Sequence, residues 1–172
     1  LYLSDIQGSE NLALDYLRLC YKYGIDINLA KNNETIILVD KYCKRVSGEA
    51  HSFTGFVRFK EIGPLSYYSV IEPDHNILPI ILRHFTNRFS DQNFIIHDLK
   101  REKAIVYNTK EAIITDLTKE QGEKLSNKID DSDFENLWRT FYNSVNIEER
   151  KNHKCRNQHM PRRYWKHLTE LQ

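Results

Sequence analysis

Cysteine is scarce in this sequence, and its spacing excludes the small disulfide-stabilised proteins. The chain has three cysteines, Cys20, Cys43 and Cys155, which is an odd number without a CxxC pair. Disulfide frameworks and zinc ribbons need paired cysteines at short spacings. We therefore expect free thiols and a cytoplasmic protein.

Long apolar runs and nucleotide-binding glycine motifs are also missing. No stretch is long and apolar enough to cross a bilayer, and no signal peptide is evident. The sequence contains no GxGxxG, P-loop or GxSxG motif, so we expect no nucleotide cofactor and no serine hydrolase. Because the sequence begins with Leu1 rather than Met, we expect it to be part of a longer chain.

The charge balance is nearly even. The 172 residues include 25 lysines and arginines and 24 aspartates and glutamates, and 40% of the residues are hydrophobic. This composition is typical of a globular protein, and the length predicts a single domain over residues 1–172. Any strongly basic surface must come from local segregation of charge.

Apolar residues at helical spacing predict three helices in the first half of the chain. The first covers 9–23, with Ser9 as its cap and Gly24 at its end. The second begins after Asn33, and the third follows Pro73 and covers 78–89. The outer face of the second helix carries three basic residues that we interpret as a solvated face: Lys41, Lys44 and Arg45.

Alternating patterns predict a sheet. Residues 52–61 alternate with period two, and residues 65–72 follow a Gly-Pro turn, so we expect a hairpin. Three further strands are predicted at 93–98, 103–108 and 111–115. The fold class is therefore α+β, with an antiparallel or mixed sheet of about five strands covered by amphipathic helices.

The region 132–172 is predicted to be a helical C-terminal subregion. Ser132 and Glu135 form a capping-box signature, and Trp138 lies on the apolar face that follows. Residues 150–167 contain seven lysines and arginines and no acid.

Cations at this density suit a phosphate backbone, and neighbouring aromatic rings such as Trp165 suit base stacking. Arg58 could line the same groove or serve instead as a buried partner of Glu72 or Asp98. The predicted nucleic-acid-binding residues are His51, Arg58, Arg150, Lys154, Arg156, Arg162, Arg163 and Tyr164.

A second group of side chains could hold a divalent metal near the ends of the predicted strands. It consists of Glu72, Asp74, His75 and His84, whose carboxylates and imidazoles are suitable ligands. Their spacing matches no established ligand motif. A bound metal there could activate water against a phosphodiester.

Four long segments resemble an uncharacterised bacterial family named for DNA metabolism, which carries a domain of unknown function. They are EAHSFTGFVRFKE, YYSVIEPDHNILPIILRHFTNRF, FIIHDLKR and LWRTFYNSVNIEERKNHKCRNQHMPRRYWKHLTEL. The resemblance spans roughly 1–170. It implies a neighbouring radical-SAM protein of DNA modification or repair as partner, and in some members fusion to a uracil-DNA glycosylase-like domain. Members have a further N-terminal part.

Three functions remain open from the sequence. The first is an accessory DNA-binding domain that presents DNA to a radical-SAM or glycosylase-type partner. The second is a metal-assisted nuclease or base-processing enzyme. The third is a protein-interaction scaffold that docks the radical-SAM partner through its aromatic C-terminal helix.

Overall fold

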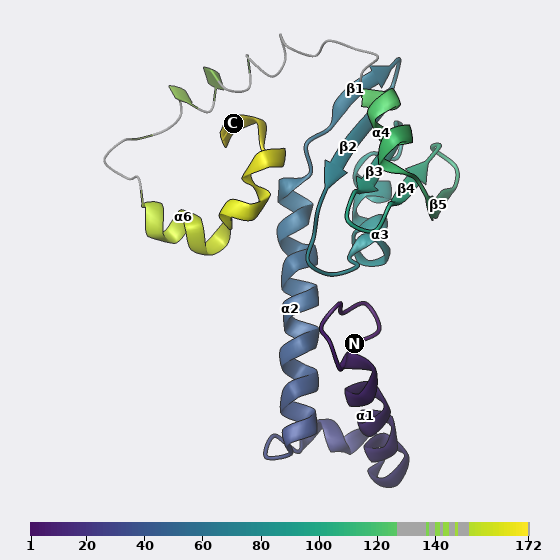
Figure 1. The fold of residues 1–172 in the computed structure, drawn as a ribbon, viewed down its shortest axis with the longest axis vertical. Coiled ribbons are helices and arrows are strands. Elements are labelled where there is room, and N and C mark those ends of the chain that lie inside the picture. The colour runs from purple at the N-terminus through teal and green to yellow at the C-terminus, as the bar shows by residue number, and fades with distance from the viewer. Residues whose placement is uncertain (127–136, 138–139, 142, 145–146, 148–151, 172) are drawn as a thin grey trace. The chain divides into compact units, whose positions relative to one another are not determined.

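The computed structural model describes residues 1–126, 137, 140–141, 143–144, 147 and 152–171 (Figure 1). The chain divides into two compact units. The first unit consists of Leu1–His51 with Asp74–Ile77, and the second of Ser52–Pro73 with Leu78–Gln172. The fold class is α+β, as predicted.

The first unit begins with helix α1, Ser9–Tyr23, followed by the 3-10 helix η1, Ile25–Leu29. The predicted helix bounds are confirmed. Ser9, however, is not the cap, because Gly8 occupies the N-cap position with φ 84° and the Ser9 hydroxyl donates to the carbonyl of Ser4 instead. Gly24 ends the helix with φ 72°, a conformation that glycine adopts without steric cost.

Helix α2, Glu34–Phe56, is one continuous helix of 23 residues (Figure 1). Its start is confirmed: the Asn33 side-chain oxygen accepts a hydrogen bond from the Ile36 N–H at 3.3 Å, which is N-capping geometry. Within the first unit, Ile36, Val46 and Ala50 recur at helical spacing and are each at most 5% exposed.

The predicted strand over 52–61 is wrong for its first half. Residues 52–56 are the last turn of α2, and the first strand starts only at Lys60. Phe53 and Phe56 are three residues apart, a spacing that places them on one face of a helix but on opposite faces of a strand. Phe53 is 2% exposed, and its ring meets that of Phe56 edge-on at 5.9 Å.

The second unit is built on a mixed five-stranded sheet in the order β1-β2-β3-β4-β5. All neighbours pair antiparallel except β2 and β3, which are parallel and are joined through helix α3, Leu78–Arg88. The strands are Lys60–Gly63, Ser66–Ile71, Asn93–Asp98, Lys103–Tyr107 and Ala112–Asp116. The hairpin of β1 with β2 and the three later strands are therefore confirmed, with shifts of one residue at most for the later strands.

Helix α3 covers one face of the sheet through an aromatic cluster. The ring of Phe59 lies 5.7 Å from Phe85, 5.2 Å from Phe89 and 5.8 Å from Phe94 of β3. Edge-to-face contacts of this kind add to the free energy gained by burying the rings. This cluster is the core of the second unit on that face.

The opposite face carries a buried polar pair beneath helix α4, Lys119–Ser126. Tyr68 and His97 are 3% and 0% exposed, and the Tyr68 hydroxyl lies 2.7 Å from His97 Nδ1. His97 Nε2 lies 2.8 Å from the Leu117 carbonyl, which can only accept, so the neutral ring carries its hydrogen on Nε2. A side chain at Gly122 would begin 2.5 Å from both partners, so this close approach requires glycine.

The chain ends in helix α6, His153–His159, and the 3-10 helices η3, Arg162–His167, and η4, Thr169–Leu171. The predicted capping box and Trp138 lie outside the described residues. Leu137 and Phe141 are described and are 65% and 52% exposed.

Candidate nucleic-acid interface

The basic segment at the C-terminus is shaped by two local signals. The Asn152 side-chain oxygen accepts from the Cys155 N–H at 2.9 Å and caps α6. Pro161 disfavours helix at Met160, so α6 ends there and η3 begins in a new direction. The segment therefore folds into two short helices that bring residues of one next to residues of the other.

Tyr164 anchors this segment to the second unit. Its ring is 4% exposed and lies 4.8 Å from the ring of Phe53 and 5.9 Å from that of Phe56. Leu168, four residues later, is fully buried. In this structure the Tyr164 ring therefore packs against other rings inside the protein, and its predicted role in nucleic-acid binding stays a prediction.

The Arg58 side chain is also held by contacts within the protein. Its Nε and Nη2 atoms both donate to the carboxylate of Glu170, at 3.2 and 2.5 Å, and its Nη1 donates to the Gly55 carbonyl at 2.6 Å. The side chains are 25% and 4% exposed. The prediction that Arg58 lines a nucleic-acid groove is therefore not supported. Its buried partner is Glu170 rather than Glu72 or Asp98.

Glu72 accepts a hydrogen bond from Lys166 of η3 at 2.5 Å. His167 Nε2 lies 3.4 Å from the same carboxylate, which forms an ion pair only when the ring is protonated. Burial acts to raise the pKa of Glu72. The hydrogen bond and charge of Lys166, followed by the interaction with His167, have a larger opposite effect, so the pKa of Glu72 is lowered. Burial lowers the pKa of His167, against the pull of Glu72. These contacts fix η3 against the end of β2.

Other residues of the segment, which take no part in these contacts, form a cluster of two cations on an aromatic ring. The guanidinium of Arg156 lies 4.7 Å from the centre of the Trp165 ring, and that of Arg162 lies 5.5 Å from it. The indole N–H donates to the Met160 carbonyl at 2.9 Å, which fixes the ring plane. We call these three side chains the Arg156–Trp165–Arg162 cluster. In the described part of the chain, neither guanidinium forms an ion pair with a carboxylate.

This arrangement can bind an anion. A guanidinium held over an aromatic ring keeps N–H groups at its edge that can donate to phosphate. For Arg156 the Nε is buried and Nη2 lies 3.3 Å from His153 Nδ1, so Nη1 is the group that remains to donate. Two such groups on one ring concentrate positive charge that the ring itself cannot neutralise. Residues 152–169 contain no acidic side chain that could compete.

The other predicted binding residues are distributed as follows. Lys154 is exposed on α6, and Arg163 lies 4.7 Å from the Tyr164 ring and donates to its hydroxyl at 3.1 Å. His51 is an exposed residue of α2 in the first unit. Arg150 lies outside the described residues. The prediction that Lys154, Arg163 and His51 contact nucleic acid stays a prediction.

The predicted metal site is not supported. Among the described residues, no three histidine, cysteine, aspartate or glutamate side chains lie close enough together to hold a metal ion. Glu72 is held by Lys166, as described above. The backbone N–H groups of Asp74 and His75 both donate to the Glu49 carboxylate, at 2.7 and 2.8 Å, in a loop that this contact fixes to α2. His84 is exposed on α3.

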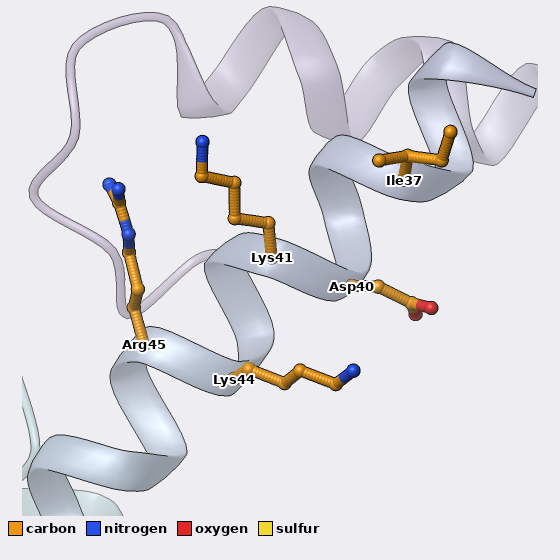
Figure 2. A pocket seen from close by; sticks show the side chains of 5 residues that line it. All are labelled: Ile37, Asp40, Lys41, Lys44 and Arg45. Carbon is orange, nitrogen blue, oxygen red and sulfur yellow. The ribbon is translucent and has the colours of Figure 1, made fainter.

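The first unit has a basic hollow on the helix face for which the sequence predicts only exposure to solvent. It has a volume of about 540 Å³ and lies against Ile37, Asp40, Lys41, Lys44 and Arg45 of α2. Figure 2 shows Lys41 and Arg45 extending from the same side of the helix and Lys44 from another. The spacing of three cations within one and a half turns was the signal in the sequence.

The fold and these sites define an α+β protein with two cationic surfaces, one in each unit. The family model "Domain of unknown function (DUF4130)" matches residues 7–170, and the chain belongs to this family. No curated protein and no solved structure shows significant similarity to the chain. Within the described residues, no helix combines the length and the apolar character needed to span a membrane.

Proposed function

We propose that the chain is an accessory nucleic-acid-binding domain that acts in DNA repair or modification. The observation that carries this proposal is the Arg156–Trp165–Arg162 cluster, in which two guanidinium groups lie on one fixed indole ring. Net charge does not carry it, since the chain has a formal charge of only +1. The positive potential is local to the segment that η3 and α6 form.

The binding chemistry follows from the cluster. Arg156 and Arg162 donate hydrogen bonds to phosphate oxygens, and the exposed Lys154 adds a third positive charge on the same segment. Each phosphate that is neutralised releases condensed counterions, which is the main source of affinity for a polyanion. The exposed part of Trp165 offers a surface on which an unpaired base can stack. None of these contacts reads a base sequence, so binding is expected to depend little on sequence.

The biological setting of this proposal comes from the resemblance of the sequence to a family named for DNA metabolism. We propose that the domain holds DNA for a radical-SAM or glycosylase-type enzyme that carries out the chemistry.

The test is a salt titration of DNA binding. The affinity of the full 172-residue chain for fluorescently labelled 20-nucleotide single-stranded and double-stranded DNA is measured by anisotropy from 50 to 300 mM NaCl. The proposal predicts that log Kd rises linearly with log salt, with a slope of about 2 to 3 if three cations each contact a phosphate. No binding at the lowest salt, or binding that is independent of salt, would contradict the proposal.

A further inference from the structure

We infer that the basic hollow on α2 is a second phosphate-binding site, which contacts the backbone of the same class of ligand. The hollow is lined by Ile37, Asp40, Lys41, Lys44 and Arg45, and nothing in the family description assigns it a role. This inference rests on the proposed function, because the ligand it names is a nucleic acid.

The charge of the hollow is positive despite the presence of Asp40. The carboxylate of Asp40 accepts a hydrogen bond from Lys31 at 2.6 Å, and this bond lowers the pKa of Asp40. The pair of Asp40 and Lys31 is neutral, so Lys41, Lys44 and Arg45 contribute three positive charges. All three side chains are exposed, and in the described part of the chain none of them forms an ion pair.

The spacing of the cations fits a strand of phosphates. Lys41 and Arg45 are four residues apart on one side of the helix, which separates their positions by about 6 Å along the axis. This is comparable to the separation of neighbouring phosphates in a nucleic-acid strand. Figure 2 shows their amino and guanidinium groups extended to the same side. Lys44 leaves the helix from an adjacent side and can contact a flanking phosphate.

The floor of the hollow is apolar, which favours a nucleotide over a small inorganic anion. Ile37, which lines the hollow, is 47% exposed. A sugar or base laid on Ile37 removes apolar surface from water while its phosphates meet the cations. Cations beside an apolar side chain are therefore complementary to a nucleotide, which carries phosphates beside a sugar and a base.

The experiment compares two double variants of the full chain with equal changes of charge. In Lys41→Gln/Arg45→Gln both cations on one side of the hollow are removed. The matched control is Arg18→Gln/Lys22→Gln, which removes one arginine and one lysine from the exposed surface of α1 in the same unit. Circular dichroism and thermal melting establish that both variants fold, and a charge-conserving Lys41→Arg/Arg45→Lys variant checks that charge is the cause.

The result expected is a salt dependence of DNA binding that is smaller by about 1.4 to 1.8 in log–log slope for Lys41→Gln/Arg45→Gln. The control and the charge-conserving variant keep the slope of the unaltered chain. If Lys41→Gln/Arg45→Gln binds DNA with an unchanged slope while Arg156→Gln/Arg162→Gln loses slope, the α2 site is overturned and the proposed function stands. If the unaltered chain binds no DNA, both are overturned.

Discussion

At the scale of single residues, the contact between Arg58 and Glu170 has the clearest energetic consequence. It joins residues 112 positions apart, and the Glu170 side chain is 4% exposed. Removing one partner of a buried ion pair leaves the other charge without compensation, which costs about 3–5 kcal/mol when both are buried. Arg58 is a quarter exposed, so water offsets part of that cost.

Glu170→Gln is therefore expected to lower the free energy of unfolding by about 2 kcal/mol, because Arg58 keeps its charge and loses its carboxylate. Urea denaturation followed by circular dichroism measures the change. The control is Asp15→Asn, which breaks the exposed pair of Asp15 with Arg18 and should change stability by less than about 0.5 kcal/mol. Equal midpoints for Glu170→Gln and the unaltered chain would show that the pair does not hold the C-terminal segment.

At the scale of elements, α1, α3 and β3 could be predicted from local sequence patterns because their signals are short-range. Gly24 marks the end of α1, and the short apolar run of β3 is buried on both faces of the sheet. The last turn of α2 could not be distinguished from a strand by local patterning. The aromatic and β-branched residues of this stretch favour a strand. Phe53 and Phe56 share one face only in a helix, where both rings contact Tyr164, more than 100 residues later.

The candidate site was predicted in part for the same reason. The basic composition of 150–167 identifies the segment, and the aromatic Trp165 within it marks the cluster. Composition cannot tell which aromatic ring is buried. Tyr164 and Trp165 are neighbours in sequence, but only the first packs on Phe53.

Replacement of these two neighbouring rings is expected to separate structure from binding. Trp165→Leu removes the ring on which Arg156 and Arg162 lie, so the affinity for single-stranded DNA should fall by about 5-fold to 100-fold with little loss of stability. Tyr164→Leu should instead lower the free energy of unfolding by about 1–3 kcal/mol through poorer packing, while the folded protein keeps its affinity.

Anisotropy with labelled single-stranded DNA, at a temperature where both variants are folded by circular dichroism, gives both quantities. If Tyr164→Leu loses as much affinity as Trp165→Leu, then the buried ring takes part in binding and the assignment of roles is wrong.

At the scale of the whole molecule, the buried His97 and the half-buried His167 contribute to the pH dependence of stability. Burial lowers the pKa of His97 and of His167 in the folded chain. The unfolded chain therefore takes up protons more readily as the pH falls below about 6.5, the ordinary histidine value. Stability from these groups is present in full above that pH and decreases as the pH falls toward their lowered pKa values.

The expected outcome is a lower urea midpoint at pH 5.5 than at pH 7.5, with a smaller difference in His167→Gln, which has one titrating group fewer. His153→Gln is the matched control, since His153 is exposed on α6. A midpoint that rises on acidification over this range would contradict the pKa shifts.

The central claim is that charge is gathered locally in a chain whose net charge is close to zero. It is tested most directly by the salt dependence of DNA binding in Arg156→Gln/Arg162→Gln, compared with Arg83→Gln/Arg88→Gln, which removes two exposed arginines from α3 of the same unit. The account predicts that the first variant loses about 1.4 to 1.8 from the log–log slope and the second loses none. Equal losses in the two variants, or no loss in either, would contradict it.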